Sequence, residues 1–280
     1  MIFFVKIIKV KGVLMVNRKD LENYIKNIPP APDILKRTIE QVQKQELKKA
    51  GDIAKQDIIL LKYMQNLINK PIYGFKNKIT DITQIFTILG ADLIYELLHH
   101  YLLSLLSPKK WHIFNLNESS FNELQANLSF YWGKVLEYEK IKDKEVLSAI
   151  SLVPSAIIVC DELFQNSIQE LDILSDSSII DYEFLLYRLT KVHLKRLSIK
   201  IGKYWEYPKK SLDIIEASSK TTKITDSQTI RLGQWIHLIL FYVLSKPIFI
   251  NTNLNSFIKF DIDYIQPIYG DFENALGEYF

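Results

Sequence analysis

The chain has 280 residues and a mass of 32.8 kDa, and 48% of its residues are hydrophobic, which is enough for a sizeable core and excludes a disordered chain. Its 35 basic and 32 acidic residues give a formal net charge of only +3, so the composition does not favour nucleic acid or an anionic membrane as a partner. Gly and Pro number 9 each, which is low for a β-rich domain because such domains use both residues in turns. We therefore predict an all-α fold.

The amino terminus is apolar, but lysines interrupt it at positions 6, 9 and 11. No stretch there approaches the ~20 apolar residues that cross a bilayer. A secretory signal is not favoured either, because no small-residue cleavage site follows. We interpret residues 1–17 as an N-terminal extension and expect residues 1–14 to precede the natural start at Met15.

The first clear helical pattern follows Asp57, which is placed to cap a helix. That helix should end near Asn69-Lys70-Pro71, because proline disfavours helical geometry in the residue before it. Apolar residues at spacings of one, three and four predict one buried stripe along it. These residues are Leu60, Leu61, Met64, Leu67 and Ile68.

Two further helices are predicted before residue 107. Thr80 or Asp81 caps the first, and Gly90 is placed to end it in a left-handed conformation. Asp92 begins the second, an apolar helix that runs to about Leu106.

Residues 108–117 read as a loop, and they divide an N-terminal helical part, residues 18–107, from a C-terminal part, residues 118–250. The tail, residues 251–280, has five acidic residues and no basic one from position 261 onward, and we assign no regular structure to it. The C-terminal part contains five candidate helices, at 118–139, 143–165, 179–203 with a break near residue 190, 208–219 and 227–245.

Four segments of the N-terminal part, taken in order and spacing, resemble the HDOD family. They are Ile28-Pro29-Pro30-Ala31-Pro32, Ile53-Ala54-Lys55-Gln56-Asp57, Leu67-Ile68-Asn69-Lys70-Pro71-Ile72-Tyr73-Gly74 and the run from Ile79 to Gly90. Two positions depart from the family pattern, since Ile58 and Lys70 stand where the family commonly has a proline and a serine. The resemblance implies about five N-terminal helices, packed on a C-terminal part that is similar to an HD domain.

Catalytic HD proteins bind one or two metal ions through a histidine, a His-Asp pair and a later aspartate, and the metal activates a water. The segment from Ala149 to Ala156 resembles the family run Leu-His-Asp-Ile-Gly, which puts Val153 and Pro154 at the positions of the His-Asp pair. Neither side chain can bind a metal.

A second position of the family pattern has also changed. Trp205-Glu206-Tyr207-Pro208 resembles the Trp-x-x-Pro corner of the family, and Ser218 and Ser219 follow where HD-GYP relatives often carry paired histidines. The resemblance therefore implies that the hydrolytic ligands are lost. We assign no catalytic, cofactor-binding or metal-binding residue and expect no cofactor.

Each of the five histidines has a structural interpretation that we favour. His99 and His100 are adjacent, so on a helix they point about 100° apart and do not easily face one metal. His193 lies near a position where the family often has a histidine, but a hydrogen bond at a helix end is the favoured role. His112 and His237 have no acidic or histidine neighbours at ligand spacing.

Three other features have a structural and a functional interpretation. Cys160 is followed by Asp161 and Glu162, which disfavour a thiolate nucleophile, so we expect a buried reduced thiol. The aromatic run 130–132 predicts core packing rather than a stacking platform for bases. A basic face predicts a solvated helix surface, with an anion, a phosphate backbone or an acidic partner helix as the alternative ligand. Its residues are Lys191, Lys195, Arg196, Lys200 and Lys203.

We therefore expect a non-enzymatic regulatory module of bacterial signal transduction in the cytoplasm. A helical groove between the two parts would bind a protein partner or a small nucleotide. One alternative is a residual metal-dependent phosphohydrolase with the ligands His193, Asp161 and Glu162. The other is nucleic-acid binding through the basic 191–203 face.

Overall fold

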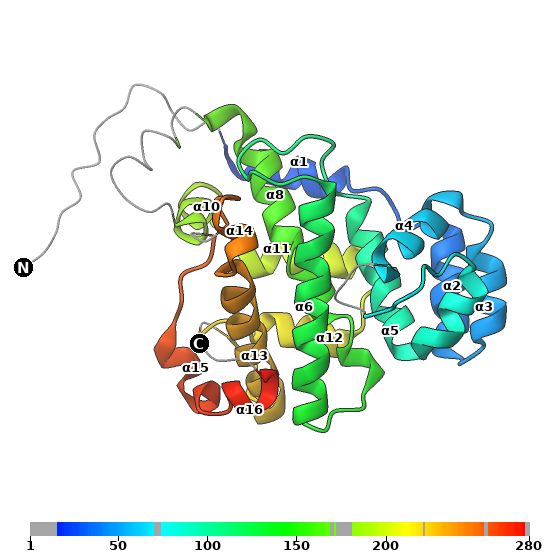
Figure 1. Ribbon diagram of the computed structural model, residues 1–280. Helices are drawn as coiled ribbons and strands as arrows, with labels where there is room; N and C mark the ends of the chain where they lie inside the picture. Colours follow the sequence, from blue (N-terminus) through cyan, green and yellow to red (C-terminus); the bar gives the residue numbers. More distant parts are fainter. Residues whose placement is uncertain are drawn as a thin grey trace, which may run out of the picture.

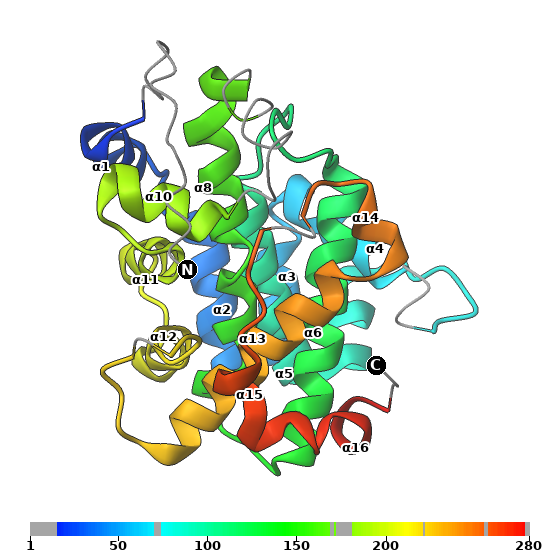
Figure 2. The same ribbon diagram turned by 90° about the vertical axis from the view of Figure 1, so that its left-hand side faces the viewer.

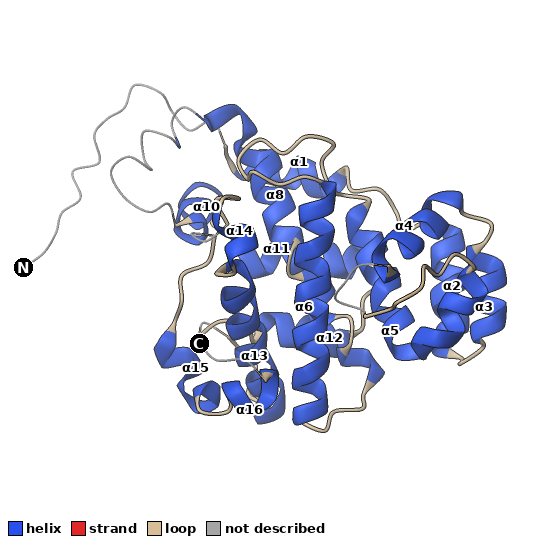
Figure 3. Ribbon diagram, viewed as in Figure 1, coloured by secondary structure: helices blue, strands red, loops and turns tan. Residues whose placement is uncertain are grey.

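The computed structural model describes residues 16–69, 74–168, 171, 181–220, 222–254 and 257–277. Within these residues every regular element is a helix and no strand occurs (Figure 3), which confirms the all-α prediction. Residues 1–15 of the predicted extension lie outside the described residues. Residues 70–73 of the third family-like segment do so too.

Four helices of the N-terminal part pack together on the right of Figure 1: α2 (Asp33–Gln43), α3 (Leu47–Ala54), α4 (Ile58–Ile68) and α5 (Ile82–Ser104). α4 begins where the sequence predicts, because the carboxylate of Asp57 accepts the backbone N–H groups of Ile59 and Leu60 at 2.9 and 3.0 Å. Of its predicted stripe, four residues are buried and Leu61 is half-buried.

α5 contains the two helices that the sequence predicts on either side of Gly90. Asp81 caps the first by accepting the N–H of Gln84 at 2.8 Å. Gly90 has a φ of 75° and a ψ of 170°, a conformation that side-chain-bearing residues rarely adopt, and the chain bends there. The second half of α5 is buried almost throughout and joins the N-terminal helices to the rest of the protein.

The C-terminal part is built around α6 (Glu118–Tyr138), the long helix at the centre of Figure 1. The prediction of one helix over 143–165 is wrong. The chain instead forms a 3-10 turn (Lys144–Val146), α7 (Ala149–Leu152) and α8 (Ser155–Phe164). The break before α8 falls at Pro154, whose ring nitrogen has no N–H to continue the hydrogen bonding of α7.

The segment Lys144–Ser167 is apolar and long enough to cross a membrane by composition alone. However, 83% of its most apolar window is buried inside the protein. It is therefore a core segment of this fold, and its apolar character follows from its neighbours on all sides.

The remaining predicted helices of this part are confirmed. A break separates α10 (Tyr182–Thr190) from α11 (Leu194–Tyr204), and α12 (Lys209–Glu216) and α13 (Ser227–Leu244) follow. α11 packs on both α8 and α12, and α7 contacts α11 and α12. α13 packs on α12 and on α6. Figure 2 shows this arrangement from the side.

The C-terminal tail is helical where no helix was predicted. It contains α15 (Ile262–Tyr269), which packs on α13, and α16 (Phe272–Leu276), which packs on α6; the short α14 (Pro247–Ile250) precedes them. Ile265, Ile268 and Leu276 are buried, so these helices complete the core of the C-terminal part.

The two parts meet through packed side chains. The indole N–H of Trp205 donates to the carbonyl of Pro29 at 3.0 Å, so the Trp-x-x-Pro corner contacts the first family-like segment. The ring of Tyr207 lies edge-on to His99, with centroids 4.6 Å apart. α1 (Arg18–Lys26) also crosses over, since it packs on α8 and α10.

Candidate functional site

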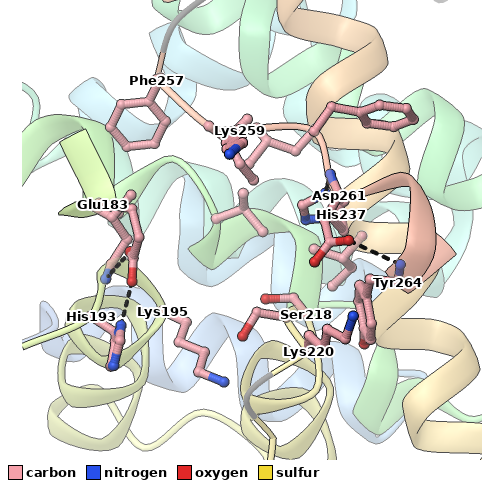
Figure 4. Close-up of a pocket in the computed structure, with 18 of the residues that line it drawn as sticks. Glu183, His193, Lys195, Ser218, Lys220, His237, Phe257, Lys259, Asp261 and Tyr264 are labelled. Carbon is pink, nitrogen blue, oxygen red and sulfur yellow. Dashed lines mark hydrogen bonds and ion pairs between the residues drawn. The ribbon is translucent and has the colours of Figure 1, made fainter. Parts of the chain in front are cut away.

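A pocket of about 700 Å³ lies within the C-terminal part. Its walls come from the starts of α8, α10 and α11, the end of α12, the middle of α13 and the segment 257–264 that leads into α15 (Figure 4). The predicted groove between the two parts is therefore not where this pocket lies.

The pocket brings together several positions that the family resemblance singled out. Val153, which the resemblance places at the position of the family's histidine, lies on one wall, while Ser218 and Ser219 lie on another wall and His193 on a third. Pro154 does not line the pocket; it precedes the first turn of α8.

Part of the pocket wall is apolar. Its side chains are buried or nearly so, which leaves a surface without hydrogen-bonding groups for a ligand to satisfy. The apolar residues are Val153, Ala156, Ile215, Ile236 and Leu240.

His193 makes the hydrogen bond at a helix end that the sequence predicts. Its Nδ1 contacts a carboxylate oxygen of Glu183, and the other oxygen of Glu183 accepts the backbone N–H of Leu194 at 2.8 Å. The ring of His193 also stacks on Tyr187, with centroids 4.4 Å apart. Glu183 therefore stabilises the start of α11 and orients His193 at the pocket wall.

Lys195 is the deepest cation of the pocket, with a side chain only 8% exposed. Its ammonium group donates to the carbonyl of Glu216 at 3.0 Å and lies 3.7 Å from the carboxylate of the same residue, which Arg196 approaches to 3.0 Å. The two contacts with the carboxylate of Glu216 are ion pairs rather than well-directed hydrogen bonds. Burial lowers the pKa of Lys195, and the charge of Glu216 opposes that shift.

The basic 191–203 residues therefore do not form one free surface. Lys195 and Arg196 share the partner Glu216, whereas Lys191, Lys200 and Lys203 are exposed. Two of the five cations are already paired within the protein.

His237 joins two pocket walls. Its Nε2 accepts the backbone N–H of Asp261 at 3.2 Å, and the ring also hydrogen-bonds the backbone of Ser218. Burial lowers the pKa of His237, which favours the neutral ring that this acceptor role requires. Sequence reasoning missed the role of His237 because its partners lie far from it in sequence.

α13 approaches the end of α12 closely, next to the pocket wall that Ser218 and Ser219 form. A Cβ at Gly233 would lie 2.3 Å from the carbonyl oxygen of Ala217, so only glycine fits there. The hydroxyl of Tyr264 donates to the same carbonyl. Ala217 therefore holds both α13 and α15 next to Ser218 and Ser219.

The residues do not fit a metal centre of the HD type. Among the described residues no group of three or more His, Cys, Asp or Glu is arranged to hold a metal ion. Val153, Ser218 and Ser219, which the resemblance places at ligand positions, offer neither imidazole nor carboxylate to the pocket. Asp161 does not line the pocket; it is fully buried.

Asp161 has a structural role instead. Its carboxylate accepts the backbone N–H groups of His112, Ile113 and Phe114 at distances of 2.8 to 3.1 Å. The proposed set of His193, Asp161 and Glu162 is therefore not brought together at this pocket, where only His193 lies. The carboxylate holds the predicted 108–117 loop against α8.

A second polar cluster is enclosed between α5 and α6. His100 lies 3.0 Å from the hydroxyl of Ser129 and 4.0 Å from the carboxyl group of Glu96. Burial raises the pKa of Glu96 to about 8 and lowers that of His100 to about 3, so both groups are neutral near pH 7 and do not form an ion pair.

His99 and His100 point in different directions. Nδ1 of His99 lies 2.7 Å from the carbonyl of Tyr95, and burial lowers the pKa of His99 to about 4. The two rings have different neighbours, as the helical angle between them predicts. Both histidines are core residues.

One further expectation is confirmed in full, and another holds for two of its three residues. Cys160 is fully buried, and burial raises the pKa of its thiol, which makes it a poor nucleophile. Tyr131 and Trp132 are packed in the core, while Phe130 is 40% exposed.

Comparison with known proteins supports one family. A model of the HDOD domain matches residues 28–221. No curated protein matches the chain. Among solved structures, a protein from Shewanella amazonensis SB2B, named as a candidate metal-dependent phosphohydrolase, is 12% identical with a TM-score of 0.52, and the match covers 85% of this chain and 94% of that one. A virulence factor from Campylobacter jejuni subsp. jejuni is 17% identical over 79% of this chain and 81% of its own, with a TM-score of 0.39.

The first of these two structures supports an HD-like helical fold, and at this identity it supports the fold alone. The family match spans well over half of the chain and includes the Trp205 corner and the positions around Val153. The chain belongs to the HDOD family.

Proposed function

We propose that the protein is a non-catalytic regulatory module that binds a small ligand in the pocket of its C-terminal part. The observation that carries this proposal is the replacement of the HD ligand positions by Val153, Ser218 and Ser219 around a pocket that stays open. A volume of about 700 Å³ lies in the range of small-molecule sites. A protein partner would then respond to the bound state, as expected for cytoplasmic signalling in bacteria.

The competing proposal is a residual phosphohydrolase. It is supported by the name of the Shewanella amazonensis protein and by the shared fold. Against it stand the donor atoms of the pocket, because serine hydroxyls and a valine do not replace the imidazole and carboxylate ligands that activate a metal-bound water.

Metal analysis combined with a hydrolysis assay separates these two proposals. Protein purified without chelators should contain far less than one manganese, iron or zinc ion per chain. It should not hydrolyse bis(p-nitrophenyl) phosphate above background when Mn²⁺ is added. Stoichiometric metal together with hydrolysis that disappears in the His193→Ala variant would overturn the non-catalytic proposal.

Nucleic-acid binding through the 191–203 face is the third alternative. Because Lys195 and Arg196 are paired with Glu216, only three cations of this face are free of that internal contact. We expect little binding of a 20-base-pair duplex at 150 mM salt. A steep fall of affinity with salt that flattens in a Lys191→Ala/Lys200→Ala/Lys203→Ala variant would instead support this alternative.

A further inference from the structure

The lysines of the pocket differ in whether their charge is already compensated. Lys195 is paired with Glu216, as described above. Lys220 and Lys259 are exposed and make no hydrogen bond or ion pair with any residue that the structure describes. In Figure 4 Lys259 lies on the upper side of the pocket and Lys220 on the lower side. The two lysines therefore stand on different walls of the pocket.

The carboxylates of the pocket are mostly engaged. Asp181 accepts the N–H of Phe184 at 2.9 Å, Glu183 that of Leu194 at 2.8 Å and Asp261 that of Tyr264 at 3.1 Å. These three carboxylates lie at the starts of α10, α11 and α15, where the helix dipoles offset negative charge. Asp263 is exposed in the first turn of α15, where the same dipole acts on it.

Lys220 and Lys259 are therefore the charges of the pocket that no described residue compensates, whereas each of its carboxylates lies at a helix start, and buried apolar side chains form part of the wall. Rings of Phe260 and Tyr264 also line the pocket, next to the buried His237. Such a site suits a molecule with a flat apolar body and one anionic group.

We infer that the pocket binds an amphiphilic organic anion, such as a phosphate ester or a carboxylate, with the anionic group between Lys220 and Lys259 and the apolar body on Val153, Ile236 and Leu240. This inference rests on the proposed function and names the class of its ligand. The anion would also join the segment 257–264, which lies outside the 28–221 family match, to the segment after α12.

Two fluorescent probes with the same rings test the inference. 1-Anilinonaphthalene-8-sulfonate carries an anionic group, and N-phenyl-1-naphthylamine is its neutral counterpart. The sulfonate should bind wild-type protein at least tenfold more tightly than the neutral probe. The Lys220→Ala/Lys259→Ala variant should weaken sulfonate binding about tenfold and change neutral-probe binding less than twofold. The exposed Lys109 provides the matched control, since Lys109→Ala should change neither.

Displacement of the sulfonate identifies the head group. AMP displaces it if the site takes phosphate esters, and decanoate displaces it if the site takes carboxylates. Failure of both at millimolar concentration contradicts the inference.

A blocking variant separates failure of the inference from failure of the proposed function. Ser219→Trp places an indole in the pocket from the wall after α12, and Ile258→Trp does so from the opposite segment, with thermal melting as the check on folding. If both probes bind equally well and blocking removes both, the pocket binds ligands but the anionic class is wrong. If blocking changes neither probe, the pocket is not the site and both proposals fall.

Discussion

The protein contains two polar clusters that differ in what surrounds them. Between α5 and α6, Glu96, His99 and His100 are enclosed on every side and contact only protein atoms. In the C-terminal part, His193 and His237 line a pocket, and each is held by a partner from another element. The first cluster comes from one helix, whereas the second is assembled from many.

The difference shows why adjacent histidines are a poor guide to a functional site. Three polar residues within two turns of α5 face the core because that half of the helix is buried throughout. The pocket histidines, 44 residues apart by their numbers, reach one space because α11 and α13 both pack near the end of α12. A ligand can reach only the second cluster.

The largest effect is expected for a buried carboxylate that neither cluster contains. Asp161→Asn removes the charge that accepts three backbone N–H groups of the 112–114 segment and places an amide group against them. We expect a loss of roughly 4 kcal/mol in the free energy of unfolding, measured by urea denaturation. A variant as stable as the wild type would show that the Asp161 carboxylate does not hold the 112–114 segment.

The next effect acts on a close helix contact beside the pocket. Gly233→Ala forces α13 away from the carbonyl of Ala217, and we expect a loss of about 3 kcal/mol together with weaker probe binding. Gly133→Ala is the matched control, because Gly133 lies in α6 with nothing within 4 Å of the added Cβ. That control should gain roughly 0.5–1 kcal/mol from helix propensity. Equal effects of the two substitutions would contradict the close approach at Ala217.

Local signals predicted most helix boundaries in this chain. Asp57 and Asp81 cap helices through their own neighbours, and Gly90 bends the chain through its own φ angle, so each could be identified from a few residues. The prediction of one helix over 143–165 failed because this segment is apolar on every face. Without a polar face, periodicity could not indicate where its helices begin and end.

The pocket could be predicted only in part. Val153, Ser218 and His193 were singled out by family resemblance, but the segment 257–264 matches no motif, and its place in the pocket depends on tertiary packing. A local signal for α15 did exist, since Ile262, Ile265 and Ile268 recur at a spacing of three after a capping aspartate. Pro267 within the same segment argues against a helix and masks that signal.

The enclosed cluster should respond to pH. Glu96 has a pKa of about 8 in the folded protein and 4.5 as its ordinary value, so between pH 6.5 and 8 the folded state retains a proton that the unfolded chain has lost. Relative to the Glu96→Gln variant, the stability of the wild type should therefore fall as pH rises through this window, by about 1.5 kcal/mol. Glu96→Gln should abolish that fall, as measured by urea denaturation at both pH values.

Below pH 6.5 the opposite sign applies, because His99 and His100 stay neutral in the fold while the unfolded chain gains protons. Acid destabilisation should therefore persist in the Glu96→Gln variant. Glu137→Gln, an exposed change on α6, should leave the whole profile as in the wild type. A wild-type profile from pH 6.5 to 8 that matches the profile of the Glu96→Gln variant would show that Glu96 is ionised in the fold.

The smallest effect concerns how the end of the tail is attached to α13 and α6. Arg231 donates to both carboxylate oxygens of Glu139 at 2.8 and 2.9 Å and to Asp271 at 2.7 Å, which ties the region before α16 to α6. Arg231→Lys keeps the charge but loses the forked geometry, and at 33% exposure we expect a cost of about 0.5–1 kcal/mol. Amide hydrogen exchange should accelerate in residues 262–276 and remain unchanged in α5, because only the tail is held by this attachment. The control Arg18→Lys, in an exposed pair with Glu22, should change neither region. Acceleration in α5 as well would mean that α5 and the tail open together as one cooperative unit. The enclosed cluster would then be no more stable locally than the pocket.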